Sequence, residues 1–222
     1  MSEVISWLHL TDLHVGQPNG WLWQSMRQQF YEDLRLMADA TGPWDLVLFT
    51  GDFVQKGNAD EFRSAATELE RLWKHFNRLG SNPLLLCVPG NHDLVRPADT
   101  DPITRQSLRW HDKGEEDVKS EFWTNNKSKY RKAVERSLKN YTGWLKALKV
   151  PKAKLVKGML PGDFSAVIQR NDIYVGLIGL NTTFLQLGKG EYEGKLDLHL
   201  QQLHGVCSDD PQTGVTVSIW RS

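Results

Sequence analysis

The stretch PGNHD, at residues 89–93, decides the fold of this chain. It directly follows an apolar run at residues 84–88, which predicts a loop at the end of a buried strand. Two earlier apolar runs, at residues 4–10 and 46–49, end in the same way, each in a short polar segment. In an open α/β sheet the carboxyl ends of the strands form the crevice in which ligands bind. The three polar segments therefore predict one shared site.

Two amphipathic segments lie between these three apolar runs. Apolar residues recur at three- and four-residue steps over residues 23–37 and again over residues 62–79, which predicts a helix in each place. The first part of the chain thus predicts the order β-α-β-α-β. Parallel strands joined by right-handed crossovers are the expected consequence.

The remainder of the chain predicts helices first and strands afterwards. A long helical region is expected at about residues 107–149. Strands at residues 164–169 and 173–180 flank a polar turn, which predicts a hairpin. A short helix at residues 196–203 and a strand at residues 215–220 complete the predicted elements.

The helical region carries much of the positive charge of the chain. Residues 103–157 hold 15 Lys plus Arg against 6 Asp plus Glu, an excess of nine in a chain whose formal net charge is zero. A basic segment suits a polyanion such as nucleic acid, and aromatic residues among the charges are available to stack on bases. These aromatic residues are Trp110, Trp123, Tyr130, Tyr141 and Trp144. The alternative is that Trp123, Tyr141 and Trp144 pack the apolar stripe while the lysines form a solvated face.

Length and composition indicate an ordinary globular protein. We expect a single domain over residues 1–222, in which about residues 95–160 form a basic helical insertion or cap. No apolar run is long enough to span a membrane, and no signal-peptide pattern opens the chain. Cys87 and Cys207 do not make a disulfide framework. We therefore expect a cytoplasmic protein without a membrane partner.

The polar segments after the strands hold residue types that bind metal ions. Asp12 and His14 are two residues apart, so in an extended backbone both side chains face the same way. Asp52 follows a glycine, which lets the backbone come close to a bound ion, and Asn91 adds a neutral carbonyl oxygen. Oxygen and imidazole ligands without a thiolate favour Mn²⁺, Fe or Zn²⁺ over a closed structural zinc site.

Each of these motifs alone is weak evidence. An Asp-x-His pair arises readily by chance, a Gly-Asp pair is usually a turn, and His92 could simply cap a helix. The conjunction is what favours a metal site, because three ligand-bearing loops each follow an apolar strand within one β-α-β-α-β unit.

Taken together, the motifs resemble the calcineurin-like metallophosphoesterase superfamily. The resemblance rests on Asp12-Leu13-His14, Gly51-Asp52 and Gly90-Asn91-His92-Asp93, in this order and at this spacing. It covers residues 6–93 well and residues 179–182 and 194–203 loosely, whereas residues 94–159 match nothing in the family and look like an insertion. The resemblance implies an α/β fold, a metallophosphoesterase-type β-sandwich flanked by helices.

The resemblance also implies a centre of two divalent metal ions, with Mn²⁺ favoured and Fe or Zn²⁺ as alternatives. Asp12 and His14 would hold the first ion, Asp52 would bridge the two, and Asn91 would bind the second. In this family the two ions generate hydroxide and stabilise an in-line displacement at phosphorus. The implied activity is hydrolysis of phosphodiester bonds, with a nucleic acid or nucleotide as the substrate.

His92 and Asp93 are the catalytic residues that the resemblance implies. His92 would protonate the leaving oxygen or place a positive charge near the scissile phosphate, and Asp93 would orient the His92 loop or cap the next segment. Residues 12–17 are similar to the opening motif of DNA-repair nucleases, whereas the segment after Asp52 is similar to class III cyclic-nucleotide phosphodiesterases. Both branches break phosphodiesters. No substrate-binding residue is assigned.

Two departures from the family pattern qualify this interpretation. Gln55 stands where the protein Ser/Thr phosphatase branch has an aspartate, which argues against that branch. The later histidine motifs of the family have no match in this sequence. The second ion would therefore have only Asp52 and Asn91 as ligands and would bind weakly. The last strands of the fold would also be missing. His199 and His204 are less favoured as replacements than as exposed helix residues. The alternative is an incomplete or regulated effector or binding module of a larger multidomain protein, with little activity of its own.

Overall fold

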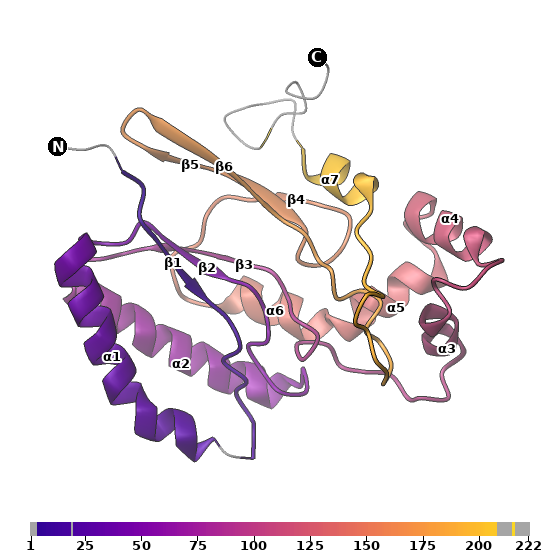
Figure 1. The fold of residues 1–222 in the computed structure, drawn as a ribbon, viewed down its shortest axis with the longest axis horizontal. Helices are drawn as coiled ribbons and strands as arrows, with labels where there is room; N and C mark the ends of the chain where they lie inside the picture. The colour runs from indigo at the N-terminus through magenta and orange to yellow at the C-terminus, as the bar shows by residue number, and fades with distance from the viewer. Residues whose placement is uncertain (1–3, 19, 208–214, 216–222) are drawn as a thin grey trace.

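The computed structural model describes residues 4–18, 20–207 and 215 (Figure 1). Three short parallel strands form the first sheet, in the order β1-β2-β3. They are β1 (Trp7–Leu10), β2 (Leu46–Phe49) and β3 (Leu84–Cys87). Leu10 pairs with Phe49 and Phe49 with Cys87, so the three strands end in register at one edge of the sheet. The predicted parallel pairing is confirmed.

Two long helices, α1 (Trp21–Thr41) and α2 (Ala59–Arg78), connect these strands as the periodicity predicts. The start of α2 is fixed by Asn58, whose side chain accepts a hydrogen bond from the Glu61 N–H at 2.9 Å. Phe62, Leu69 and Phe76 lie on the buried face of α2. That face covers one side of the parallel sheet, because these residues share an apolar cluster with buried residues of β1, β2 and β3.

A second sheet covers the other side of the first. Its antiparallel strands, in the order β4-β5-β6, are β4 (Val156–Lys157), β5 (Phe164–Arg170) and β6 (Ile173–Gly179). The predicted hairpin between the last two is confirmed, and Asn171 turns the chain with φ of 53°. An apolar cluster joins the two sheets. Its buried members are Ile5, Leu46, Leu86, Phe164, Ala166 and Ile168. The fold is therefore an α/β sandwich of two sheets flanked by helices, as expected.

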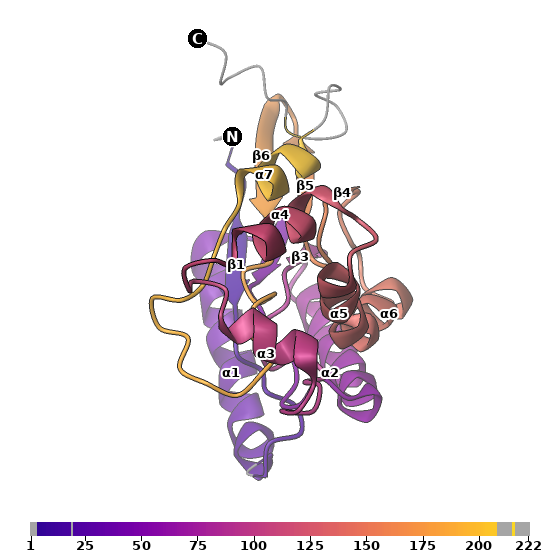
Figure 2. The same cartoon turned by 90° about the vertical axis from the view of Figure 1, so that its right-hand side faces the viewer.

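The long helical region is divided into four helices. These are α3 (Pro102–Leu108), α4 (Glu116–Thr124), α5 (Lys129–Ser137) and α6 (Lys139–Ala147). α6 packs on α2, where the ring of Trp144 lies 5.2 Å from that of Phe62. Figures 1 and 2 show α3, α4 and α5 beyond the carboxyl ends of the parallel strands. The basic region thus contributes one helix to the helical layer and places three others on the side of the predicted site.

The aromatic residues of this region are buried and do not face solvent. Their exposed fractions are 3% for Trp110, 4% for Trp123, 8% for Tyr130, 1% for Tyr141 and 7% for Trp144. The prediction that they are available to stack on bases is therefore wrong. The alternative of core packing holds for Trp123, Tyr141 and Trp144, and Trp110 and Tyr130 are buried as well. Their hydrophobic area outweighs any use at the surface, because burying one such ring removes roughly 150–250 Å² from water.

The end of the chain differs from the prediction in one element. The short helix is α7 (Leu200–Val206), which begins later than expected because the His199 side chain accepts a hydrogen bond from the Gln201 N–H and caps it. The ring of His199 also stacks on Trp123, with 4.5 Å between centroids. Of the predicted strand at residues 215–220, only Val215 belongs to the described residues, without strand structure, and the remainder lies outside them. Among the described helices, none combines the length and apolar character that crossing a membrane requires.

Candidate metal centre

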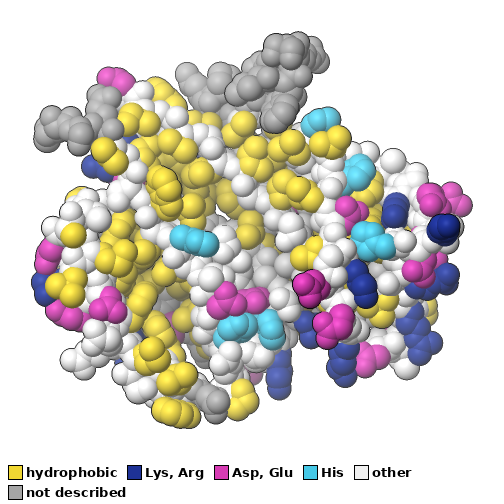
Figure 3. All heavy atoms as spheres, viewed as in Figure 1, with side chains coloured by type: hydrophobic (Ala, Val, Ile, Leu, Met, Phe, Trp, Pro, Cys, Tyr) yellow, Lys and Arg dark blue, Asp and Glu magenta, His cyan; other side chains and the backbone are white. Residues whose placement is uncertain are grey.

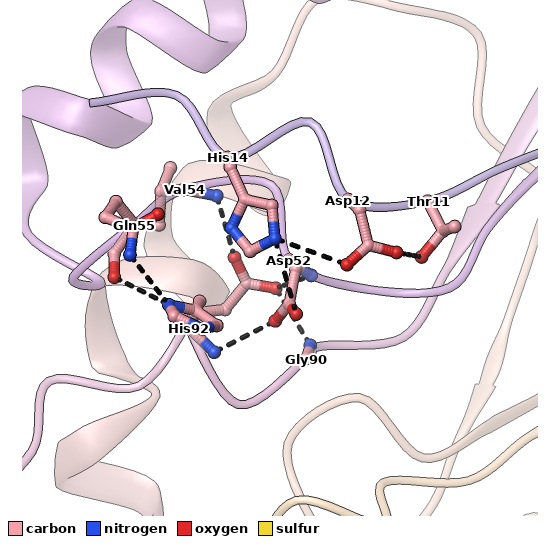
Figure 4. Close-up of polar contacts among 9 residues, drawn as sticks. Thr11, Asp12, His14, Asp52, Val54, Gln55, Gly90 and His92 are labelled. Atoms are coloured by element: carbon pink, nitrogen blue, oxygen red, sulfur yellow. Dashed lines mark hydrogen bonds and ion pairs between the residues drawn. The ribbon is translucent and has the colours of Figure 1, made fainter. Parts of the chain in front are cut away.

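Three loops, one after each strand of the parallel sheet, meet at one place (Figure 4). Asp12 and His14 follow β1, whereas Asp52 and His92 follow β2 and β3. Backbone pairing continues past the strand ends, since the Asp12 N–H donates to the Gly51 carbonyl at 3.2 Å. The His14 N–H likewise donates to the Asp52 carbonyl at 2.9 Å. The sheet edge therefore holds these side chains together, as the strand pattern predicts.

The backbone at the ligand positions adopts a conformation that side chains other than glycine rarely take. Asp12, His14 and Asp52 have φ of 58°, 46° and 57°, and they are three of the four non-glycine residues with positive φ in the described chain. The expectation of an extended backbone from Asp12 to His14 is therefore wrong. Each such residue costs about 1–3 kcal/mol and is typical of functional sites. Strain concentrated on these residues marks this loop cluster as the functional part of the sheet edge.

Nitrogen and oxygen donors converge within these loops. One ligand atom each from His14, Asp52 and His92 lies within 4.8 Å of the other two. His14 Nε2 lies 3.2 Å from Asp12 Oδ1 and 4.0 Å from Asp52 Oδ2. His14 Nδ1 is buried and has no hydrogen-bond partner among the described residues. A site with two carboxylates, imidazole nitrogens and no thiolate fits a divalent cation such as Mn²⁺, Fe²⁺ or Zn²⁺.

The protonation of His92 follows from its partner. His92 Nδ1 lies 2.9 Å from the backbone carbonyl oxygen of Gln55, which can only accept, and 3.3 Å from the Gln55 side-chain nitrogen, which can only donate. The shorter contact favours a proton on Nδ1. The ring packs edge-on against His14 at 4.7 Å between centroids. The His92 N–H also donates to Asp52 Oδ1 at 2.9 Å. His92 is thus held at two points, and its Nε2 is left for a substrate atom or a cation.

Asp93 ties two of the loops together from behind the site. Its carboxylate accepts the N–H groups of Gly90 and Asp52 at 2.9 Å and that of Val54 at 3.2 Å. Asp93 is fully buried, and burial raises the pKa of its carboxyl to about 7 although the three hydrogen bonds lower it. These contacts suit a residue that orients the His92 loop, one of the two roles that the resemblance allowed. We therefore describe Asp93 as a positioning residue.

Two glycines allow the loops to approach this closely. A Cβ atom added to Gly90 would lie 2.1 Å from Asp52 Oδ1, and one added to Gly51 would lie 2.5 Å from the Gly90 nitrogen. Gly51 also has φ of 102°, which other residues rarely adopt. The glycines that precede Asp52 and Asn91 in the sequence are therefore required by the close contact between the two loops.

Sequence analysis missed two polar contacts of the site. The Gln55 carbonyl holds His92, a contact that neither family pattern at Gln55 predicts. The Thr11 hydroxyl donates to Asp12 Oδ2 at 2.7 Å, and its position next to Asp12 was the one available signal. Asn91 is half-buried between Gly90 and His92, in the loop where the prediction placed it.

Comparison with known families agrees with this geometry. The family model for calcineurin-like phosphoesterases matches residues 5–192, which include every residue of the site and both sheets. No curated protein matches the chain. Fold and site define a metal-binding α/β protein with donors at the ends of parallel strands. The chain belongs to the calcineurin-like phosphoesterase family and is a metal-dependent phosphoesterase.

Proposed function

We propose that this chain hydrolyses phosphodiester bonds with two divalent metal ions, for which Mn²⁺ is our first choice. The observation that carries the proposal is the placement of Asp52. Its Oδ1 accepts the His92 N–H, while its Oδ2 lies 4.0 Å from His14 Nε2, so the two oxygens point to different loops. A carboxylate placed in this way can serve an ion on each side. Asp12 and His14 would complete the first ion's ligands, and Asn91 would serve the second.

The residues of the site have separate roles in the proposed hydrolysis. Bound divalent ions would supply a nucleophile at neutral pH and stabilise charge on the phosphoryl group. His92 donates its Nδ1–H to the Gln55 carbonyl, and with a second proton on Nε2 it would act as the general acid that protonates the leaving oxygen. Asp93 keeps the His92 loop and the Asp52 loop in register through its three backbone contacts.

The substrate that we propose is a nucleic acid or a nucleotide. Support comes from α5, which carries four Lys and Arg residues against one Glu and lies beyond the strand ends on the side of the site in Figures 1 and 2. Asn140, at the start of α6, donates to the Gly57 carbonyl at 2.9 Å, two residues after Gln55. Exposed Lys139 therefore lies close to the loop that holds His92. A positive border of this kind attracts a polyanionic substrate.

A second candidate function follows from the number of ligands. The ligands assigned to the second ion are only Asp52 and Asn91, and few ligands mean weak binding. This favours a regulated effector or binding module of a larger protein, in which activity depends on ligands that other segments supply.

Metal titration with an activity assay tests the proposed function. The purified chain is treated with EDTA, Mn²⁺ is added back, and hydrolysis of bis-p-nitrophenyl phosphate is followed beside elemental analysis. We expect activity to appear with Mn²⁺ and to saturate near two ions per chain. Saturation at one ion without turnover would refute the two-ion mechanism and favour the second candidate function.

Neutralising exposed lysines of α5 and of the start of α6 should weaken binding to nucleic acid. We expect the triple change Lys129→Gln, Lys132→Gln and Lys139→Gln to lower affinity for single-stranded DNA at low salt. The slope of log affinity against log salt should become shallower by about 2, since each lost phosphate contact changes it by about 0.7 on single strands. Fluorescence anisotropy over a salt series measures both quantities.

A matched triple variant at the opposite end of the sheet is the control. The control changes three lysines that are also exposed, Lys146, Lys149 and Lys154. They lie on either side of Pro151, whose carbonyl accepts the Leu85 N–H near the start of β3. Their replacement by glutamine should leave the salt slope unchanged. Equal effects from both triple variants would show that the charge acts only as a diffuse, solvated surface.

A further inference from the structure

A cavity of about 140 Å³ lies beside the metal centre, between α1, α2 and the ends of β1 and β2. Its lining is mainly apolar. The lining residues are Leu10, Thr11, Asp12, Leu13, Trp23, Phe30, Phe49, Glu68, Leu69 and Leu72. Figure 3 shows hydrophobic side chains gathered along α1 on the face that also presents a group of Asp and His side chains. The cavity is therefore not an isolated void in the core, since it opens beside the ends of the strands.

The cavity and the metal centre share a wall. Thr11 and Asp12 line the cavity, and Asp12 Oδ1 lies 3.2 Å from His14 Nε2 at the centre. The Asp12 side chain is 56% exposed, so it stands at the opening and not behind a barrier. A phosphoester held at the centre can thus place one of its ester groups in the cavity.

The walls of the cavity are suited to an aromatic ring. The Trp23 and Phe30 rings lie 5.5 Å apart and are tilted by 59°, which leaves ring faces and edges available for a third ring. Leu69 and Leu72 are buried on α2 and form an aliphatic side of the lining. Aromatic and aliphatic walls with few polar groups are typical of small-molecule pockets.

One polar group in the lining is held firmly in place. Glu68 Oε2 accepts the Trp23 indole N–H at 3.2 Å and Arg27 Nη1 at 3.4 Å, and the other oxygen pairs with Arg71. A carboxylate has about four acceptor positions, so Glu68 retains one for a donor on the bound ring. A ring that carries an amino or hydroxyl group would gain a hydrogen bond there, although the apolar walls do not require one.

We propose that this cavity binds a single aromatic ring of the phosphoester substrate. The inference rests on the proposed function and narrows its substrate class to diesters that carry a phenyl or pyrimidine ring. The size supports one ring, because an engineered apolar cavity of about 150 Å³ binds benzene. Because Asp12 belongs both to the cavity lining and to the metal centre, a ring in the cavity would lie next to the phosphorus atom of a bound phosphoester.

Ring binding is tested first without metal, so that the result does not depend on catalysis. Phenol and cytidine are titrated into EDTA-treated protein and followed by ligand-observed NMR. We expect phenol to bind, and Leu72→Phe, which fills the cavity, to weaken it at least tenfold. Met37→Phe is the control, because Met37 is on α1, 44% exposed and outside the lining. Unchanged phenol binding in Leu72→Phe, or no binding of either probe to the wild-type chain, would overturn the proposal.

A second measurement on the wild-type chain keeps the proposal testable if Leu72→Phe does not fold. Phenyl p-nitrophenyl phosphate and methyl p-nitrophenyl phosphate share a leaving group and differ only in the other ester group. With Mn²⁺ present, kcat/KM corrected for uncatalysed reactivity should favour the phenyl ester at least tenfold. Equal values would overturn the ring site. Absence of any hydrolysis would instead contradict the proposed function, and the metal-free titration would then decide the ring site alone.

Discussion

Asp52→Asn should remove both metal binding and hydrolysis. Asparagine keeps the shape of the side chain but not its charge, and only one of its two terminal atoms accepts. The native carboxylate uses Oδ1 for the His92 N–H and directs Oδ2 toward His14 Nε2. Losing an outer partner of a metal ligand typically costs 10–100-fold in affinity or activity, so a bridging ligand should cost at least about 100-fold. Isothermal titration with Mn²⁺ and the diester assay measure the two effects.

The control for this variant is Asp39→Asn on α1. Asp39 is an exposed carboxylate, whereas the Asp52 side chain is 15% exposed; Asp39 pairs with Arg35 at 2.6 Å and lies outside the loops of the site. It should bind Mn²⁺ and turn over substrate as the wild type does, while circular dichroism verifies the fold of both variants. An Asp52→Asn chain that retains two ions and full turnover would contradict the bridging assignment.

The fold was predictable from the sequence wherever the apolar residues of a segment followed a single periodicity. The short apolar runs of β1, β2 and β3 and the helical period of α1 and α2 leave little choice of element. Parallel pairing then follows from the intervening helices. The ligands at the strand ends were predictable for the same reason, because the ends of parallel strands meet at one edge.

The features that sequence reasoning missed depend on tertiary contacts. Positive φ at Asp12 and His14 is imposed by pairing with the next loop and not by local propensity. The starts of α3 and α5 are fixed by Asp101 and Ser128, whose side chains accept N–H groups of the first turn, and the apolar stripe alone does not reveal these breaks. The burial of the aromatic residues in the basic region was ambiguous for the same reason, because a Trp among lysines gives the same sequence pattern whether it is buried or exposed. The role of the Gln55 carbonyl lies in the backbone, which no residue pattern specifies.

His92→Ala should abolish turnover and leave metal binding intact. In our assignment His92 presents Nε2 to the leaving oxygen while Gln55 holds Nδ1, so its loss removes a general acid worth roughly 10²–10⁴ in rate. The hydrogen bond from the His92 N–H to Asp52 Oδ1 is donated by the backbone, so the alanine variant keeps it. His204→Ala, at an exposed position in α7, is the matched control and should be silent. His92 lies within the same donor cluster as His14 and Asp52. If His92→Ala loses metal ions as well as activity, His92 is a metal ligand.

The leaving group distinguishes the two roles that remain if His92→Ala still binds its ions. A general acid matters most when the departing oxygen is strongly basic, because that oxygen needs a proton to leave. A positive group beside the phosphate stabilises the transition state for all leaving groups alike. We therefore expect the loss in kcat to be at least tenfold larger for alkyl esters than for p-nitrophenyl esters of the same phosphate. An equal loss for both would assign His92 to charge stabilisation, with Gln55 serving only to orient its ring.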